Sequence, residues 1–195
     1  MNILETLLTA FLSFVSTNID DIVILMLFFG SKRYSSRDIV SGQYLGISSL
    51  VVVSYIFSRV GNYINPQFIG LLGLFPIYLS IKQFVSLLKP DTDTSQIDLN
   101  KTGIISLAGV TIANGSDNIG VYVPLFATMD NHQLLILVMI FLVMTGLWCL
   151  LGKYLASHPL LAKSISRFGH IIMPVVLFLL GVYILIESGA IKLFV

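Results

Sequence analysis

Polar clusters divide this strongly apolar chain into six long apolar segments. Each segment has about the 20 residues that a helix needs to cross a bilayer. The fifth segment is the most uniform, because Thr145 and Gly146 are its only non-apolar positions between residues 134 and 151. The pattern predicts an all-α membrane protein with six transmembrane helices. The segments cover residues 4–29, 39–58, 66–88, 102–127, 133–152 and 170–188.

The second segment differs from the others because small and polar side chains interrupt it. Gly42 and Gly46 are four residues apart, and Gln43 lies between them. Small residues at this spacing allow two helix backbones to approach closely. We therefore expect this helix to pack against other helices rather than to face lipid.

The composition agrees with a membrane protein. The chain has 195 residues, of which 56% are hydrophobic and 11% charged, and its mean hydropathy is +0.92. Soluble domains carry about 25% charged residues. The low charge excludes a soluble enzyme, a disordered chain and a nucleic-acid binder. We expect one integral-membrane domain over residues 1–195.

Basic residues gather in alternate connections between the segments. Nine of the eleven lie in the first, third and fifth connecting regions, and only Arg59 and Lys192 lie on the other side. The positive-inside rule then places both termini outside the cytoplasm. The bias predicts a multi-pass membrane protein with an even number of spans. The nine residues are Lys32, Arg33, Arg37, Lys82, Lys89, Lys101, Lys153, Lys163 and Arg167.

A polar stretch at residues 89–101 divides the chain into two halves of three segments. Its proline, aspartate and threonine content is typical of a flexible linker, which the charge pattern places in the cytoplasm. We expect repeat one over residues 1–88 and repeat two over residues 102–195.

The two halves resemble each other without gaps. Residues 61–66 (GNYINP) align with residues 169–174 (GHIIMP), and Gly73 then aligns with Gly181. A second, weaker match places Asp20 on Asp117. Three spans per repeat force opposite topologies, which is the arrangement of an inverted-repeat transporter with a midplane substrate site. The alternative is a chance likeness between apolar helices.

Three acids lie near the centres of apolar segments: Asp20, Asp21 and Asp117. A charge at the bilayer centre costs about 2.5–3.5 kcal/mol on insertion scales, so it needs compensation. No Lys or Arg lies at that depth, which leaves protons or a mobile cation. The carboxylates with the neighbouring amides form an oxygen-rich candidate site for a divalent metal. The amides belong to Asn18, Asn114 and Asn118.

Both acids of the first segment reach one ion only where its helix is broken. Adjacent side chains on a regular helix point about 100° apart. Gly115, Gly120 and Pro124 favour a break in the fourth segment, whereas the first segment has no comparable glycine. The alternative interpretation is that protonated acids hydrogen-bond the helices together.

Two motifs resemble a known family. The sequences NIDDI at residues 18–22, LMLFF at 25–29 and ANGSDNIGVYVPLF at 113–126 are similar to those of the bacterial CadD-type cadmium-resistance transporters, in the lysine-exporter superfamily. The resemblance covers essentially the whole chain. It implies a six-helix efflux protein for cadmium, with zinc as a second ion, in the bacterial cytoplasmic membrane.

The resemblance and the donor chemistry differ. Cadmium is soft and favours thiolate, whereas the expected site offers oxygen and suits manganese, magnesium or calcium. We interpret Cys149 as a buried apolar residue and Glu187 as an interfacial acid, although a sulfur ligand or a release group remains an alternative for each. Cadmium is ranked first on the resemblance.

The sequence thus predicts a secondary transporter rather than an enzyme. It would export a divalent metal as one repeat rocks against the other. We expect exchange for protons to supply the energy, because the chain has no nucleotide-binding motif. No cofactor besides the transported ion is expected, and a homo-oligomer is left open. The alternative is an exporter of another cation, manganese or a cationic amino acid. An intramembrane aspartyl protease is disfavoured because its sequence motifs are missing.

Overall fold

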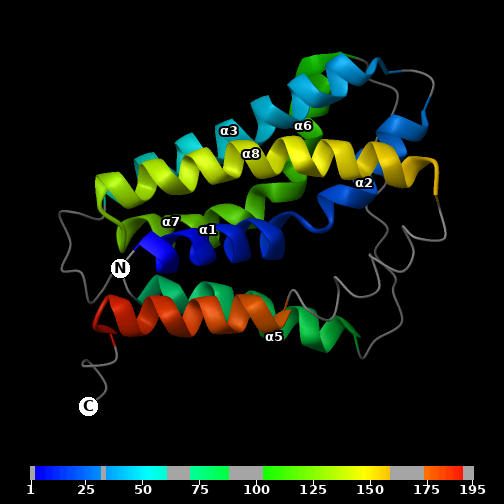
Figure 1. Cartoon of the computed structure of the whole chain (residues 1–195). Helices are drawn as coiled ribbons and strands as arrows, with labels where there is room; N and C mark the ends of the chain where they lie inside the picture. Colours follow the sequence, from blue (N-terminus) through cyan, green and yellow to red (C-terminus); the bar gives the residue numbers. More distant parts are fainter. Residues whose placement is uncertain (1–2, 32–33, 61–70, 88–102, 159–173, 191–195) are drawn as a thin grey trace.

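The computed structural model describes residues 3–31, 34–60, 71–87, 103–158 and 174–190. These residues form helices and no strands (Figure 1). Helices occur in all six expected segments, which confirms the all-α prediction. The predicted linker at residues 89–101 lies outside the described residues. So do the aligned stretches 61–66 and 169–174, except for residue 174.

The first segment is a broken helix. α1 (Ile3–Asn18) and α2 (Asp21–Gly30) are bent by 59° relative to each other. The break needs no glycine because Asp20 caps α2, accepting a hydrogen bond from the Asp21 backbone N–H at 3.1 Å. The sequence left this break uncertain, and the structure shows it.

The fourth segment is also interrupted at its centre. α6 (Ile104–Asn114) passes into a single 3₁₀ turn, η3 (Gly115–Asp117), and then into α7 (Asn118–Ala127). Gly115 follows the last residue of α6, where the sequence predicted the change. Pro124 lies inside α7.

Two continuous helices are long and apolar enough to cross a membrane. They are α3 (Ser36–Val60) and α8 (Asn131–Ala156). Asp130 begins α8 with a capping box, accepting from the backbone N–H groups of His132 and Gln133. The bent α1–α2 pair counts as a third span if it crosses as one unit. The remaining described helices are shorter and apolar, as expected of a multi-pass protein.

The long helices pack on the broken helix of the opposite half of the chain. α3 packs mainly on α6 and α7, whereas α8 packs mainly on α2 and α1. Gly42 and Gly46 make the first contact possible, since a Cβ on either would come within 2.5 Å of Leu107 or Thr111. This confirms that the second segment packs against other helices.

Aromatic rings join α1 to α7 and α8 in the core. The Phe14 ring lies 5.2 Å from that of Phe141 and 5.3 Å from that of Trp148. Tyr122 is fully buried beside Phe141. The end of α1, in the first half of the chain, is therefore packed against two helices of the second half.

A third pair of helices lies along one side of this core (Figure 1). It consists of the 3₁₀ turn η2 (Leu71–Gly73) with α5 (Leu74–Leu87), and of the helix Pro174–Glu187. They meet at Gly73 and Gly181, where a Cβ on Gly181 would lie 2.6 Å from the Gly73 carbonyl oxygen. The Ser80 hydroxyl donates to the Pro174 carbonyl at 2.7 Å. The two glycines that aligned in the sequence are therefore in contact.

Candidate functional site

The two helix breaks face each other, and the predicted acids lie in them. Asp20 lies between α1 and α2, Asp21 begins α2, and Asp117 ends the 3₁₀ turn before α7. The Asn114 amide of α6 donates to Asp21 Oδ1 at 2.7 Å, which joins the two breaks directly. Asp20 also lies within electrostatic reach of Asp117.

Asp21 is the most enclosed of the three acids, with 3% of its surface exposed. Its Oδ1 accepts from Asn114, and its Oδ2 accepts from Gln43 Nε2 at 2.7 Å. The Gln43 Oε1 in turn accepts from the Thr111 hydroxyl at 2.8 Å. Both carboxylate oxygens of Asp21 are therefore engaged by amide donors.

Asp20 and Asp117 are more open. Asp20 is half-buried, and Asp117 is exposed and makes no side-chain capping bond to α7. The Lys82 charge acts on Asp117, whereas the charges that act on Asp20 and Asp21 come from other acids. These two carboxylates are the accessible part of the site.

Asn18 is fully buried at the end of α1. Its Nδ2 donates to the Phe14 carbonyl at 2.9 Å, the Thr17 hydroxyl at 2.8 Å and the Tyr122 hydroxyl at 2.9 Å. Its Oδ1 has no hydrogen-bond partner among the described residues. A buried amide oxygen without a partner is costly, and it is free to accept a ligand.

Asn118 is 4% exposed and lies against Gly115, where a Cβ would come within 3.0 Å of the Asn118 amide nitrogen. The six predicted residues thus fall into two groups in this structure. Asp20, Asp21, Asn114 and Asp117 interact across the two breaks, whereas Asn18 joins Tyr122 and Asn118 covers Gly115. In the described part of the chain, no three His, Cys, Asp or Glu side chains lie close enough to hold a metal together. The oxygens present are carboxylate and amide oxygens.

Sequence reasoning did not assign four side chains that contact these groups. Gln43 donates to Asp21, and Thr111 donates to Gln43. Tyr122 binds Asn18 and Thr17, and Trp148 Nε1 donates to the Asn18 carbonyl at 2.7 Å. Gln43 gave the clearest signal, as an amide inside an apolar segment, but it was interpreted only as a helix-packing residue. The other three resemble ordinary core residues until their partners are known.

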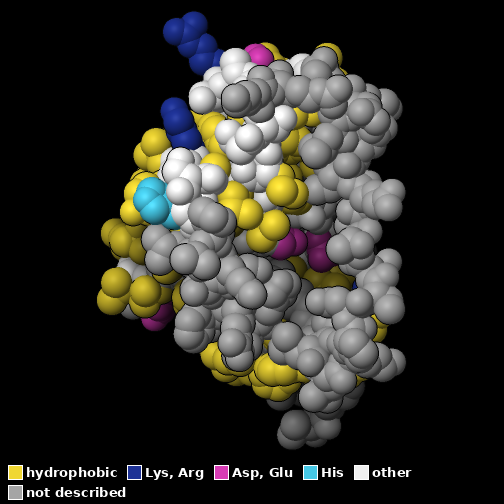
Figure 2. All heavy atoms as spheres, turned by 90° about the vertical axis from the view of Figure 1, so that its right-hand side faces the viewer, with side chains coloured by type: hydrophobic (Ala, Val, Ile, Leu, Met, Phe, Trp, Pro, Cys, Tyr) yellow, Lys and Arg dark blue, Asp and Glu magenta, His cyan; other side chains and the backbone are white. Residues whose placement is uncertain are grey.

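Acidic side chains are visible on one end of the molecule (Figure 2). Figure 2 views the end at which α2 and α8 finish, and acidic side chains are visible there within a hollow. Arg37 and Lys153 lie on helix termini at this same end, whereas Arg59 lies at the opposite end and bonds Asn131. The hollow therefore opens toward the end that the charge pattern places in the cytoplasm.

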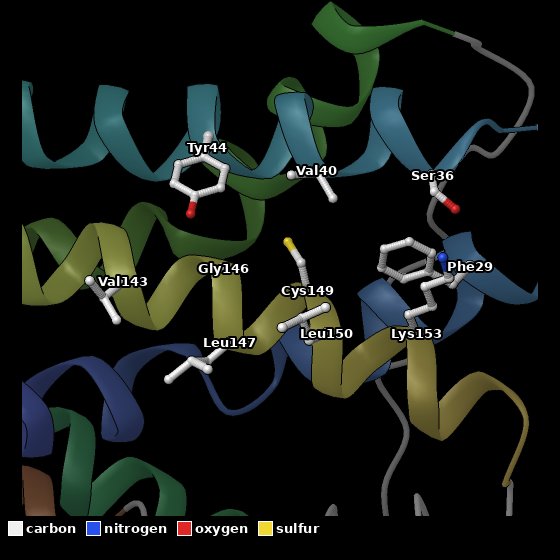
Figure 3. Close-up of a pocket in the computed structure, with 10 residues that line it drawn as sticks. All are labelled: Phe29, Ser36, Val40, Tyr44, Val143, Gly146, Leu147, Cys149, Leu150 and Lys153. Atoms are coloured by element: carbon white, nitrogen blue, oxygen red, sulfur yellow. The ribbon is translucent and has the colours of Figure 1, made fainter.

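Cys149 lines a separate pocket, between α3, α8 and α2 (Figure 3). Its sulfur points toward Val40, and Tyr44 and Lys153 lie farther along the same pocket. None of the six predicted site residues lines this pocket. Glu187 is exposed at the end of its helix, as expected of an interfacial acid.

A family model described as "Cadmium resistance transporter" matches residues 14–195. This chain belongs to the cadmium resistance transporter family. The match includes both motifs and both helix breaks, and it agrees with the resemblance seen in the sequence. No curated protein and no solved structure gives a match. The acids at the two breaks thus belong to a multi-pass member of a cadmium resistance transporter family.

Proposed function

We propose that the protein exports divalent heavy-metal ions, cadmium first and zinc second, through the site between its two helix breaks. The observation that carries the proposal is the hydrogen bond from the Asn114 amide of α6 to Asp21 at the start of α2, which joins the two breaks and brings Asp20 and Asp117 to the same region. Broken helices commonly form ion sites in transporters because unwound backbone and polar side chains replace the ion's hydration. Asp21 and Asn114 lie beside these two acids, and Asn18 and Asn118, which have other neighbours in this structure, are the remaining candidate ligands.

An oxygen site suits an exporter even for a soft metal. Cadmium bound by several thiolates would leave slowly, whereas carboxylate and amide oxygens hold it weakly enough for release. The unpartnered Asn18 Oδ1 is one such oxygen. Cys149 lies within electrostatic reach of Asp21 but lines a pocket that none of the six site residues lines, so the proposal assigns it no ligand role.

We propose proton exchange as the source of energy. The acids lie where charge is costly, so a proton that replaces the departing metal keeps the site compensated. The chain has no nucleotide-binding motif. Each transport cycle would then carry the metal outward and protons inward.

The proposed architecture is an inverted repeat with six spans. A broken helix, a long helix and a short helix follow one another in each half: α1–α2, α3 and α5, then α6–α7, α8 and the helix Pro174–Glu187. Asp20 and Asp117 take equivalent places in the two broken helices. Contact between Gly73 and Gly181 is expected if a two-fold axis passes near them.

The packing also changes the units that we expect to move. Because α3 packs mainly on α6 and α7, and α8 mainly on α1 and α2, the helices form two bundles that each contain helices from both repeats and that meet where α3 packs on α8. We propose that these two mixed bundles move against each other, rather than one sequence repeat against the other. The acidic site lies between the bundles, where such motion changes access.

Cadmium uptake by everted membrane vesicles with an imposed pH gradient tests the proposal. We expect Asp20→Asn and Asp117→Asn each to reduce uptake by at least about tenfold, because each removes a charge that the ion needs. Asp38→Asn, in the first turn of α3 and outside the site, is the matched control and should leave uptake unchanged. Uptake that ignores the gradient would contradict proton exchange, and uptake that survives both site variants would contradict the site.

Manganese is the second candidate ion, because an oxygen-only donor set favours it over cadmium from ligand preference alone. Competition experiments in the same vesicles separate the two. If manganese blocks cadmium uptake at equal concentration, manganese becomes the first candidate for the transported ion. Competition by lysine would instead favour the cationic amino acid alternative.

A further inference from the structure

Asp20 and Asp21 are neighbours in sequence but have different surroundings. Asp20 is half-buried and faces the exposed Asp117, whereas Asp21 is almost fully buried. Both Asp21 oxygens already accept short hydrogen bonds from amides, each at 2.7 Å. A cation therefore reaches Asp20 directly, but it must displace an amide to reach Asp21.

Gln43 is held rigidly in its donor orientation. The Thr111 hydroxyl donates to Gln43 Oε1, so the other end of the amide, Nε2, must face Asp21. Gln43 and Thr111 are 4% and 2% exposed. The close approach of Gly42 and Gly46 to α6 fixes the α3 backbone around Gln43.

The two amide donors belong to one bundle, and the carboxylate that they bind belongs to the other. Asp21 belongs to α2, which packs with α8, whereas Gln43 and Asn114 belong to the bundle of α3, α6 and α7. Hydrogen bonds to a charged group are stronger than those between neutral groups. The Asp21 bonds thus hold the bundles together in the state whose hollow opens at the basic end.

We infer that Gln43 is a positioning residue that keeps Asp21 away from the metal in this state. The ion is taken up by Asp20 and Asp117, and Asp21 is released only when the bundles separate. The two adjacent acids then have different tasks: Asp20 binds the ion, and Asp21 couples binding to motion. This inference rests on the proposed function of the site.

The test compares equilibrium binding of cadmium with its transport. The full-length protein is purified for binding of radioactive cadmium, and the same preparations are reconstituted into liposomes for transport. We expect Gln43→Leu to bind cadmium within about threefold of the wild type and to transport it at least about tenfold more slowly, because the lost bond is part of the bundle interface.

Thr111 provides an independent test if Gln43→Leu fails to fold. Thr111→Val keeps the side-chain shape but removes the hydroxyl that orients Gln43, so it should slow transport without changing binding. Thr111→Ser keeps the hydroxyl and should restore transport to near the wild-type rate. Ser49→Ala, on the same helix α3 as Gln43 but bonded only to its own helix, is the control and should change neither quantity.

The outcomes separate the two levels of the proposal. A wild-type protein that neither binds nor transports cadmium would overturn the proposed function and this inference with it. If the wild type is functional but Gln43→Leu loses binding and transport in parallel, the positioning role alone is overturned. Normal transport by Gln43→Leu or by Thr111→Val would also overturn it.

Discussion

The two helix breaks at the site are made in different ways. Between α1 and α2 the chain turns without a glycine. The Ile22 and Val23 N–H groups donate to the Ile19 and Asp20 carbonyls, and side chains add further bonds, since Asp20 caps α2 and Asn18 is bound to Tyr122. Between α6 and α7 the turn is a backbone feature, in which Gly115 begins a 3₁₀ turn and its N–H bonds the Thr111 carbonyl.

This difference indicates where the conformational change can be controlled. The first break adds bonds from polar side chains to its backbone bonds, and two of these side chains, Asp20 and Asn18, are also candidate ligands. An ion that binds these groups acts on the bonds that keep the helix bent. The second break depends on local backbone preference, so it provides a fixed partner. We therefore expect substitutions at the first break to have larger effects than those at the second.

The largest effect on stability is expected for Asn18→Leu. The substitution removes the donor to the Tyr122 and Thr17 hydroxyls and to the Phe14 carbonyl, at a cost of about 1–3 kcal/mol in the free energy of unfolding. Unfolding in detergent can be followed by the fluorescence of Trp148, the single tryptophan, which donates to the Asn18 carbonyl.

The control for this variant is Asn131→Ala. Asn131 is exposed and accepts from Arg59, so its loss should change stability by less than about 0.5 kcal/mol. Equal destabilisation by the two variants would show that the first break does not depend on Asn18.

A smaller effect is expected for Tyr122→Phe. The hydroxyl lies 2.7 Å from the Thr17 hydroxyl and 2.9 Å from Asn18 Nδ2, but Thr17 and Asn18 both keep partners within α1. We expect a loss of about 1 kcal/mol in thermal or denaturant unfolding. Because the bond joins α1 to α7, cadmium transport should also change, whereas a purely local role would alter stability alone.

The smallest effect is expected for Gly115→Ala. Its φ of −89° is accessible to alanine, but the new Cβ would lie 2.6 Å from Cδ1 of the buried Leu50 and 3.0 Å from Asn118 Nδ2, so both side-chain ends must shift. Helix preference favours alanine by up to about 1 kcal/mol, which nearly offsets the cost of shifting the neighbouring side chains. A loss of stability larger than for Asn18→Leu, measured in the same unfolding assay, would reverse the comparison between the breaks.

The sequence revealed the acids because charge is rare inside apolar segments. It also located the second break, since Gly115 lies beside Asp117, and the packing role of Gly42 and Gly46. It left the first break uncertain because the cap is formed by Asp20 itself, which was considered only as a ligand.

Other parts of the site depend on contacts that are distant in sequence. Gln43 bonds Asp21 across 22 positions and Thr111 across 68. No local pattern marks such partners, and the apolar context of Gln43 suggested only helix packing. The exchange of helices between the two halves is likewise a tertiary property, so a repeat found in sequence does not define the units that pack together.

Anomalous X-ray scattering from cadmium bound to the purified protein tests the central claim most directly. The account predicts one strong peak between Asp20 and Asp117 at the two helix breaks, with Asp21 still bonded to Gln43. A peak in the Cys149 pocket, with none at the acids, would contradict it.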